Sequence, residues 1–344
     1  MNFKILDGHN DTLKNIFLNR MDFLQQNDSG CIDLKRIQNS CYIGGFFAIL
    51  VPPEHPEKNN LKLSASGWEV KYAKPLDPTY AERFTDNVLK YFKTNTRKSR
   101  DIVIVRSFKD LQYCIKNNIL AVIIHFEGAE AIKDDLSNLE YFYKQGLRSL
   151  GIVWSRKNAF GFGSAFKFPD TNQKDMGLTK KGIELVKKCN DLHILIDLSH
   201  ITKRGFWDVA KTSCFPLVVS HTAVQSLCNS STNLDDEQIN AIGKSEGIIG
   251  ILFDVLNTRP DGKYEKETSI NTITNHIEYV ANKIGIDYVG IGSDFDGAVM
   301  PNILKDVTLL YNLIENLEKR GFSTEDIDKI TSKNWLRIIE KTWR

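Results

Sequence analysis

The chain has 344 residues, of which 42% are hydrophobic, and its formal net charge is +2. This length suits one large α/β barrel or two ordinary domains, and the hydrophobic content is enough for a sizeable core. The near-neutral charge, with basic residues scattered among acidic ones, indicates neither a nucleic-acid partner nor a membrane-surface partner.

Segments that target a protein to a membrane or to the secretory route have recognisable compositions, and this sequence shows none of them. No basic region followed by an apolar stretch precedes the first strand-like run, and no run approaches the roughly 20 apolar residues of a membrane span. The six cysteines form no C-x-x-C pair, so we expect reduced thiols rather than a zinc knuckle. We therefore expect a cytoplasmic protein.

Apolar runs typical of buried parallel strands alternate with segments of helical periodicity. The runs predict strands at residues 3–8, 42–51, 120–126, 147–153, 193–198, 216–220, 247–253 and 287–293. The helical segments are 79–95, 136–145, 179–190, 235–245, 269–284, 303–320 and 324–341. This alternation predicts an α/β fold, a (β/α)8 TIM barrel that forms a single domain over residues 1–344. A doubly wound open sheet is the alternative.

Two segments do not fit this alternation. Residues 101–107 form a ninth strand-like run, which we expect to be peripheral to the barrel. Residues 52–78 hold five of the nine prolines and show no clear period. Because they follow the second strand, they predict a long loop over the active face that acts as a lid or as a wall of the pocket.

Metal-binding types of side chain follow five of the predicted strands. They are His9 and Asp11, Glu127, His200, His221 and Asp294. In a parallel barrel the side chains at the C-terminal ends of the strands converge on one face. Imidazoles and carboxylates gathered there are the ligands that a divalent metal site needs. The pattern predicts a metal-dependent enzyme with its site at this face.

Each of these residues also has a structural interpretation when it is taken alone. His9 and Asp11 are two positions apart, so both can face one metal, but Asp11 can equally cap the next helix. Glu127 can bridge two cations about 3.5–4 Å apart, or it can begin a helix. His200 and His221 each follow a serine at a strand end, and as a pair they favour metal ligands over core histidines.

Two further positions complete this set of candidates. Asp294 follows the last strand, where a carboxylate can carry protons for a metal-bound water. Asp296, two residues later, fits an Asx turn better. His125 alternates with Glu127 in the same run, and we expect it to lie in the barrel interior behind the metal ligands.

With these motifs in chain order, the sequence resembles the membrane (renal) dipeptidase family, which is peptidase family M19. This family belongs to the amidohydrolase-like metal-dependent barrels, and the sequence is similar to its bacterial members. The matching stretches are residues 7–11 (DGHND), 127–128 (EG), 146–150 (GLRSL), 196–200 (IDLSH), 219–221 (VSH), 233–238 (NLDDEQ) and 290–297 (GIGSDFDG).

The resemblance implies a (β/α)8 barrel with two zinc ions. His9 and Asp11 would hold one zinc, His200 and His221 the other, and Glu127 would bridge them. A hydroxide shared by the metals would attack the scissile carbonyl, with Asp294 as the general acid/base. Family members cleave dipeptides, often with a D-residue at the C-terminal position, and commonly form homodimers.

Two positions depart from the family pattern. Trp154 stands where the renal enzymes have a histidine that contacts the substrate. Thr232 stands where the family has an arginine that binds the substrate carboxylate, and a threonine cannot form the forked pair that an arginine makes. The predicted substrate-binding residues are therefore Trp154, Thr232 and a replacement cation, for which Arg156, Lys157 and Arg259 are the candidates.

These observations leave three hypotheses. The first is a dinuclear zinc dipeptidase whose partner is a small-molecule dipeptide, although manganese, cobalt or iron would also suit the ligands. The second is a metal-dependent amidase or lactonase that acts on a compound lacking a free C-terminal carboxylate. The third is a non-catalytic binding protein on the same barrel, against which the presence of every metal position and of Asp294 argues.

Overall fold

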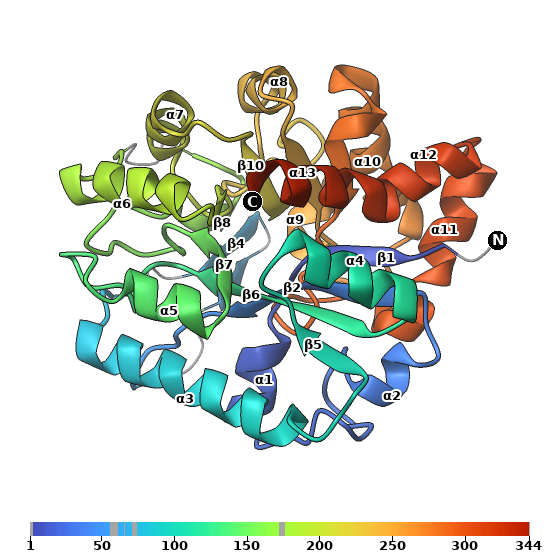
Figure 1. Ribbon diagram of the computed structural model, residues 1–344. Coiled ribbons are helices and arrows are strands. Elements are labelled where there is room, and N and C mark those ends of the chain that lie inside the picture. The colour runs from blue at the N-terminus through green and yellow to red at the C-terminus, as the bar shows by residue number, and fades with distance from the viewer. Residues whose placement is uncertain (1–2, 56–60, 65, 71–73, 172–175, 344) are drawn as a thin grey trace.

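Parallel strands arranged as a barrel form the centre of the computed structural model, which describes residues 3–55, 61–64, 66–70, 74–171 and 176–343 (Figure 1). Within these residues, eight strands follow one another in the order of the chain, each parallel to the next. They are β1 (Ile5–Asn10), β2 (Tyr42–Ile49), β6 (Leu120–Glu127), β7 (Leu147–Gly151), β9 (Leu195–Asp197), β10 (Val218–Thr222), β11 (Ile248–Ile251) and β12 (Val289–Ile291). Each predicted strand corresponds to one of them.

The first and last strands meet and close the barrel. Asn10 bridges to Phe295 in parallel, and the backbone N–H of Asp294 donates to the carbonyl of His9 at 3.1 Å. The Asp7 carboxylate reinforces this seam, because it accepts hydrogen bonds from the backbone N–H and the hydroxyl of Ser293, each at 2.7 Å. The closed seam excludes the open doubly wound sheet and confirms the (β/α)8 barrel.

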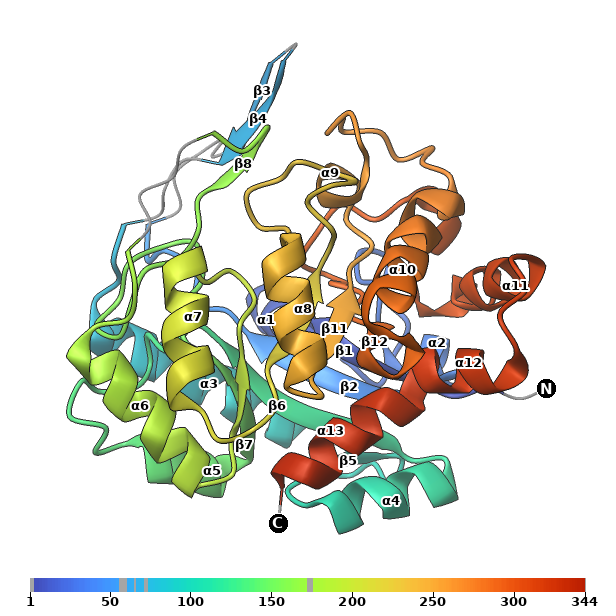
Figure 2. The ribbon, with the colours of Figure 1, turned by 90° about the horizontal axis from the view of Figure 1, so that it is seen from above.

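Helices surround the barrel in both views (Figures 1 and 2). They are α1 (Thr12–Leu18), α2 (Leu34–Ile37), α3 (Pro78–Thr96), α4 (Phe108–Asn117), α5 (Leu139–Gln145), α6 (Lys180–Asp191), α7 (Lys203–Thr212), α8 (Asp236–Lys244), α9 (Val255–Thr258), α10 (Ile270–Ile284), α11 (Tyr311–Lys319), α12 (Thr324–Asp328) and α13 (Asn334–Thr342). Most begin at a side-chain cap; Asp235, for example, forms a capping box with Gln238 at the start of α8. The helices α1, α2, α4, α7 and α9 were not predicted, because they are short or bury few apolar residues. In α4, for example, only Leu111 and Cys114 are buried.

The two C-terminal helices differ from their predicted extents. Residues 303–320 do not form one helix: 3-10 turns at Asn302–Leu304 and Val307–Leu309 precede α11. Asp306 causes the second turn, since its carboxylate accepts from the N–H of Thr308. Residues 324–341 form α12 and α13, and the π-helical segment Lys329–Lys333 lies between them.

A second sheet occupies the segment that was predicted to be a loop. Residues 52–78 contain β3 (Leu61–Ser64) and β4 (Gly67–Val70), which form an antiparallel sheet with β8 (Phe166–Phe168). The partner strand lies about one hundred residues away, so no local pattern reveals the pairing. The ninth strand-like run forms β5 (Ile102–Ile104), which pairs with the first half of β6 and lies off the eight-strand path.

The two ends of the barrel are covered by different parts of the chain. Figure 2 shows the β3–β4–β8 sheet projecting from one end, while α4 and α13 cover the other. At the α13 end, the fully buried Trp335 fills the barrel interior, and its indole N–H donates to the carbonyl of Ile291 at 2.8 Å. The indole fits because Gly8 and Gly290 face it, where any Cβ would collide with the ring. In the described part of the chain, Trp335 thus closes this end of the barrel to a ligand.

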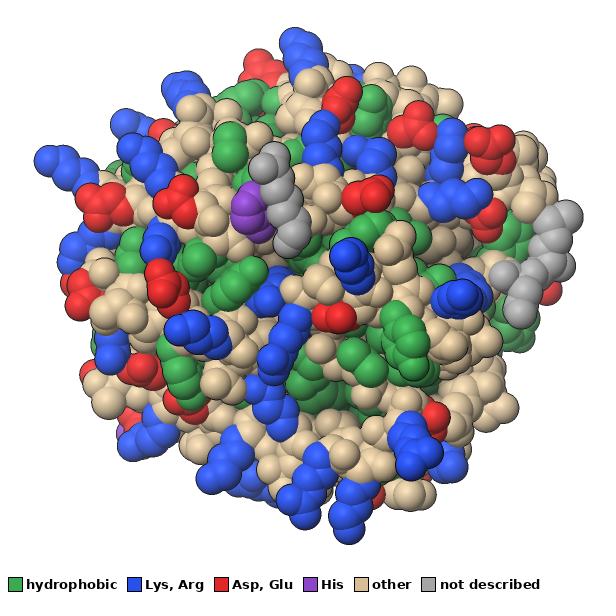
Figure 3. Space-filling view, viewed as in Figure 1, with side chains coloured by type: hydrophobic (Ala, Val, Ile, Leu, Met, Phe, Trp, Pro, Cys, Tyr) green, Lys and Arg blue, Asp and Glu red, His purple; other side chains and the backbone are tan. Residues whose placement is uncertain are grey.

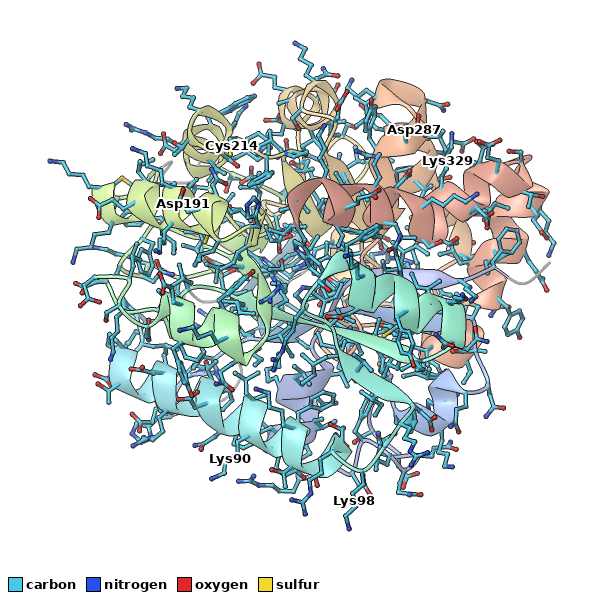
Figure 4. The ribbon with its side chains drawn as sticks, in the orientation of Figure 1. Lys90, Lys98, Asp191, Cys214, Asp287 and Lys329 are labelled. Atoms are coloured by element: carbon cyan, nitrogen blue, oxygen red, sulfur yellow. The ribbon has the colours of Figure 1, made fainter. Side chains whose placement is uncertain are left out.

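Charges of both signs are mixed on the face that carries α4 and α13 (Figure 3). Some of them tie neighbouring elements together; Lys329, for example, lies 2.9 Å from Asp287, which precedes β12 (Figure 4). Within the described residues, no helix combines the length and the apolarity needed to cross a membrane.

Removal of the Trp335 indole should destabilise the barrel without changing its other end. Trp335→Ala should lower the free energy of unfolding by about 3–5 kcal/mol, as is usual when a buried aromatic side chain is deleted. Denaturant unfolding monitored by circular dichroism measures this change. Glu340→Ala, on the exposed side of α13, is the control and should have little effect. A loss below about 1 kcal/mol for Trp335→Ala would show that the indole does not support the barrel.

Candidate metal centre

The six side chains that the sequence singled out lie together at the C-terminal ends of the barrel strands. His9 is in β1 and Asp11 precedes α1, while Glu127 ends β6. The remaining three are His200, which follows β9, His221 in β10 and Asp294 after β12. The structure thus brings together residues from five strands at the end of the barrel away from Trp335.

Glu127 lies between the imidazoles, and its two oxygens face different ones. Oε2 lies 3.7 Å from Nε2 of His9. Oε1 lies 2.8 Å from Nε2 of His200 and 3.8 Å from Nε2 of His221. Asp294 adds a further carboxylate, with Oδ1 3.9 Å from Nε2 of His9.

Glu127 belongs to two groups of potential metal ligands. One group is His9, Asp11 and Glu127, and the other is Glu127, His200 and His221; within each, the ligand atoms lie within 4.8 Å of one another. Since zinc lies about 2.0–2.2 Å from nitrogen and oxygen ligands, ligand atoms at such spacings can share one cation. Two further groups of this kind involve His9, one with His221 and Asp294 and one with His125 and Asp197.

The electrostatics of the cluster suit cations. Burial, and then the charge of Asp11, raise the pKa of Glu127, and burial with the charges of Asp11 and Glu127 raises the pKa of Asp294 well above its ordinary value. Burial and the neighbouring imidazoles hold the pKa of His9 and of His221 well below the ordinary value. The carboxylates therefore repel one another, while His9 and His221 stay in the neutral form that binds metals.

Unpartnered polar atoms in the cluster point to the same conclusion. Both ring nitrogens of His9, Oε2 of Glu127 and Nδ1 of His200 are buried and have no hydrogen-bond partner among the described residues. A buried polar atom without a partner is costly and rare, and it commonly marks a ligand or ion site. The donor set of imidazole nitrogens and carboxylate oxygens fits divalent cations such as zinc.

Backbone conformation aims two of these side chains into the cluster. His200 and Asp294 adopt left-handed conformations, with φ of 63° and 62°, which cost energy for residues other than glycine and concentrate at functional sites. Gly297 follows on the turn after Asp294, and a Cβ at this position would collide with the carboxylates of Asp11 and Asp294.

A buried network behind the centre orients His221. The Asp197 carboxylate accepts from the hydroxyl of Ser220 at 2.6 Å, and the Ser220 oxygen lies 2.8 Å from Nδ1 of His221. Because the Ser220 proton goes to Asp197, Nδ1–H of His221 donates to Ser220. Nε2 of His221 then carries a lone pair, which faces Nε2 of His200 at 2.7 Å and Glu127 beyond it. His125 lies in the barrel interior behind these groups, with Nδ1 2.9 Å from the hydroxyl of Ser149.

A cavity of about 270 Å³ opens above the centre. Asp11, Glu127, His200 and Asp294 contribute to its polar lining. Its apolar lining includes Leu50, Leu61, Trp68, Val70, Trp154 and Phe166, several of which belong to the β3–β4–β8 sheet. Of the two roles expected for residues 52–78, the structure shows the wall of a pocket.

The three predicted substrate-binding residues lie in different places. Trp154 lines the cavity. Thr232 lines an adjoining cavity that shares His200, and its hydroxyl donates to Asn257, which lines the metal-facing cavity. Arg156 does not reach the cavity, because its guanidinium is fully buried and is held by Glu130 at 2.7 Å.

Sequence reasoning missed several residues of the cavity. Lys14 lines it, with Nζ 2.9 Å from Oδ1 of Asp11. The only pattern in the sequence that could have revealed Lys14 is its position one helical turn after Asp11. Trp68 was missed because its strand was not predicted. Asp254 and Asn257 also line the cavity, and Asn257 donates to the Asp254 carboxylate at 2.5 Å.

An α/β barrel with an imidazole–carboxylate centre at the C-terminal ends of its strands defines a metal-dependent hydrolase. Comparison with known families agrees, because residues 1–343 match the membrane dipeptidase family, peptidase family M19. The chain belongs to this family, as the sequence motifs predicted, and it is a metallopeptidase of the dipeptidase type.

Three relatives illustrate this membership. A metallo peptidase from Rhodobacter sphaeroides, whose crystal structure contains a phosphinate mimic of the dipeptide L-Ala-D-Ala, is 34% identical with a TM-score of 0.91, and the match covers 99% of each chain. Dipeptidase AC of family M19 is also 34% identical, with a TM-score of 0.93, over 100% of this chain and 99% of that one. A Klebsiella pneumoniae protein from the pqqA 5′ region is 38% identical over 69% of this chain and 88% of its own length.

The arrangement around Glu127 predicts two divalent metals per chain. His221→Ala should lose mainly one of them and nearly all activity, because it removes one of the three ligands of one group. Elemental analysis of protein reloaded with zinc measures the metal content, and His55→Ala, an exposed position, is the control. One metal or none in fully loaded wild-type protein would contradict the dinuclear centre.

Proposed function

We propose that the protein is a dinuclear zinc dipeptidase that hydrolyses the peptide bond of dipeptides, including those with a D-residue at the C-terminal position. The observation that carries the proposal is that the two oxygens of Glu127 face different histidines, as a bridging carboxylate requires. The dipeptide mimic bound to the Rhodobacter sphaeroides relative supports the substrate class. The proposal includes a cytoplasmic location. It also includes the homodimer that the family resemblance implies, and light scattering of the purified protein can test this dimer.

Each residue of the centre has a distinct role in this proposal. His9 and Asp11 would hold one metal, His200 and His221 would hold the other, and Glu127 would be common to both groups. Such metals, when bound, would lower the pKa of a water and polarise the scissile carbonyl. Asp294 takes the proton of the attacking water and returns it to the amide nitrogen, so that the C–N bond breaks and a neutral amine leaves.

The size and the lining of the cavity suit a small substrate. Its volume of about 270 Å³ is close to the lower end of the range for ligand pockets, about 300–1,000 Å³. A space of this size is compatible with a dipeptide. The aromatic side chains of Trp68, Trp154 and Phe166 exclude water around the substrate, which strengthens the electrostatic interactions at the centre.

The proton transfer assigned to Asp294 predicts the behaviour of Asp294→Asn. This variant keeps the shape of the side chain but cannot exchange a proton, so kcat should fall by about 10²–10⁴-fold while both metals remain bound. Steady-state kinetics together with metal analysis on the same preparation measure the two effects. Wild-type kcat at full metal content would show that another group carries the proton.

The position of Thr232 favours one alternative, a metal-dependent amidase or lactonase that needs no free carboxylate on its substrate. Thr232 replaces the arginine of the family, and Arg156 is buried away from the cavity. The two functions differ in their response when the terminal carboxylate of the substrate is blocked.

A panel of dipeptides, their C-terminal amides and N-acyl amino acids, assayed with added zinc, distinguishes these functions. We expect kcat/KM to be highest for free dipeptides, because these are the substrates of the proposed activity. Activity restricted to blocked substrates would establish the amidase or lactonase instead. Absence of activity on the whole panel would favour a binding protein.

A further inference from the structure

A dipeptide bound at this centre presents a problem of charge. Its C-terminal carboxylate is separated from the scissile carbonyl only by the amide nitrogen and one Cα, so it must enter the cavity together with the reacting bond. A carboxylate that leaves water needs a cationic or hydrogen-bonding partner, because its desolvation is costly. The partner must therefore stand within the cavity, close to Glu127 and Asp11.

Lys14 occupies such a place. It lies on α1 one turn after Asp11, and its ammonium group is 2.9 Å from Oδ1 of Asp11. The side chain is 17% exposed and lines the cavity, so part of it is open to a ligand. Among the described residues that line this cavity, Lys14 is the only lysine or arginine.

The other basic side chains considered for this role are occupied or distant. Arg156 is buried and is held by Glu130 and by the carbonyl of Val51. Arg259 forms a forked pair with Asp261, at 2.8 and 2.7 Å. Lys157 lines a separate cavity, on the side of Lys133 and Phe160.

From this arrangement we propose that Lys14 binds the C-terminal carboxylate of the substrate, which places the specificity for a free carboxylate on α1. The inference rests on the proposed dipeptidase function and names the residue that recognises its substrate. The contact with Asp11 is compatible with this role, because an ammonium group has three N–H donors and can keep one on Asp11 while it donates another to the substrate. Asp11 thus positions Lys14 at the edge of the centre.

The test removes the charge of Lys14 while keeping the length of the side chain. Lys14→Met should lose about 10- to 100-fold in kcat/KM for L-Ala-D-Ala, the range for a charged hydrogen bond, and most of the loss should be in KM. The C-terminal amide of the same dipeptide should be affected much less. Lys14→Arg should retain most of the activity on the free dipeptide, and Lys98→Met, at an exposed position after α3 (Figure 4), is the matched control.

Two readouts other than activity separate this role from simple support of Asp11. Metal content should be the same in Lys14→Met and in wild type. By calorimetry, the phosphinate mimic of L-Ala-D-Ala should bind more weakly to Lys14→Met, by a similar factor, whereas a mimic with a blocked carboxylate should bind equally well to both proteins. Lys14→Gln repeats the comparison if the methionine variant does not fold.

Some outcomes would overturn the inference, and they differ from failure of the proposed function. Equal losses for the free dipeptide and its amide, or loss of metal in both Lys14→Met and Lys14→Gln, would show that Lys14 only supports Asp11. An unchanged kcat/KM for the free dipeptide would show that another group binds the carboxylate. If wild-type protein cleaves no dipeptide and does not bind the mimic, the dipeptidase function itself is wrong.

Discussion

Buried negative charge at one end of the barrel is the constraint on which the rest of this structure depends. Asp11, Glu127 and Asp294 lie close together in a site that excludes most water, and their mutual repulsion together with burial raises the pKa of Glu127 and Asp294. Such a cluster is stable only where cations neutralise it or where some of its members are protonated. The neutral imidazoles of His9 and His221 favour cation binding over protonation of the carboxylates. The same cations would stabilise the cluster and supply its chemistry.

The barrel holds these charges in place through its strand ends. Residues distant in the sequence meet because parallel strands end at the same face, and buried carboxylates behind that face support them. Asp7 joins β1 to Ser293 beyond β12, and Asp197 orients His221 through Ser220. The opposite end is closed by Trp335 from the last helix. The reactive groups therefore lie at the C-terminal ends of the strands, as in barrel enzymes generally, and Trp335 fills the other end.

Recognition of the substrate depends on parts of the chain that differ from the metal centre. By the family resemblance, every expected metal position is present, whereas Thr232 stands where an arginine is expected. In the cavity, Trp68 and Phe166 of the aromatic wall come from a small sheet outside the barrel, and the one lysine or arginine among the described lining residues, Lys14, comes from α1. The ends of the barrel strands thus position most of the centre, whereas the segments around the barrel position most of the side chains that line the cavity.

The sequence by itself determined the barrel, and it singled out six residues that the structure brings together at one end of it. Buried parallel strands read as continuous apolar runs, and the metal-binding types of residue lie directly after them, so that a local pattern was sufficient. Only the tertiary structure decided which segments form the pocket. The pairing of β4 with β8, the burial of Arg156 against Glu130 and the presence of Lys14 in the cavity depend on contacts between distant segments. Local periodicity shows which face of a segment is buried, but it does not show which distant residues that face will meet.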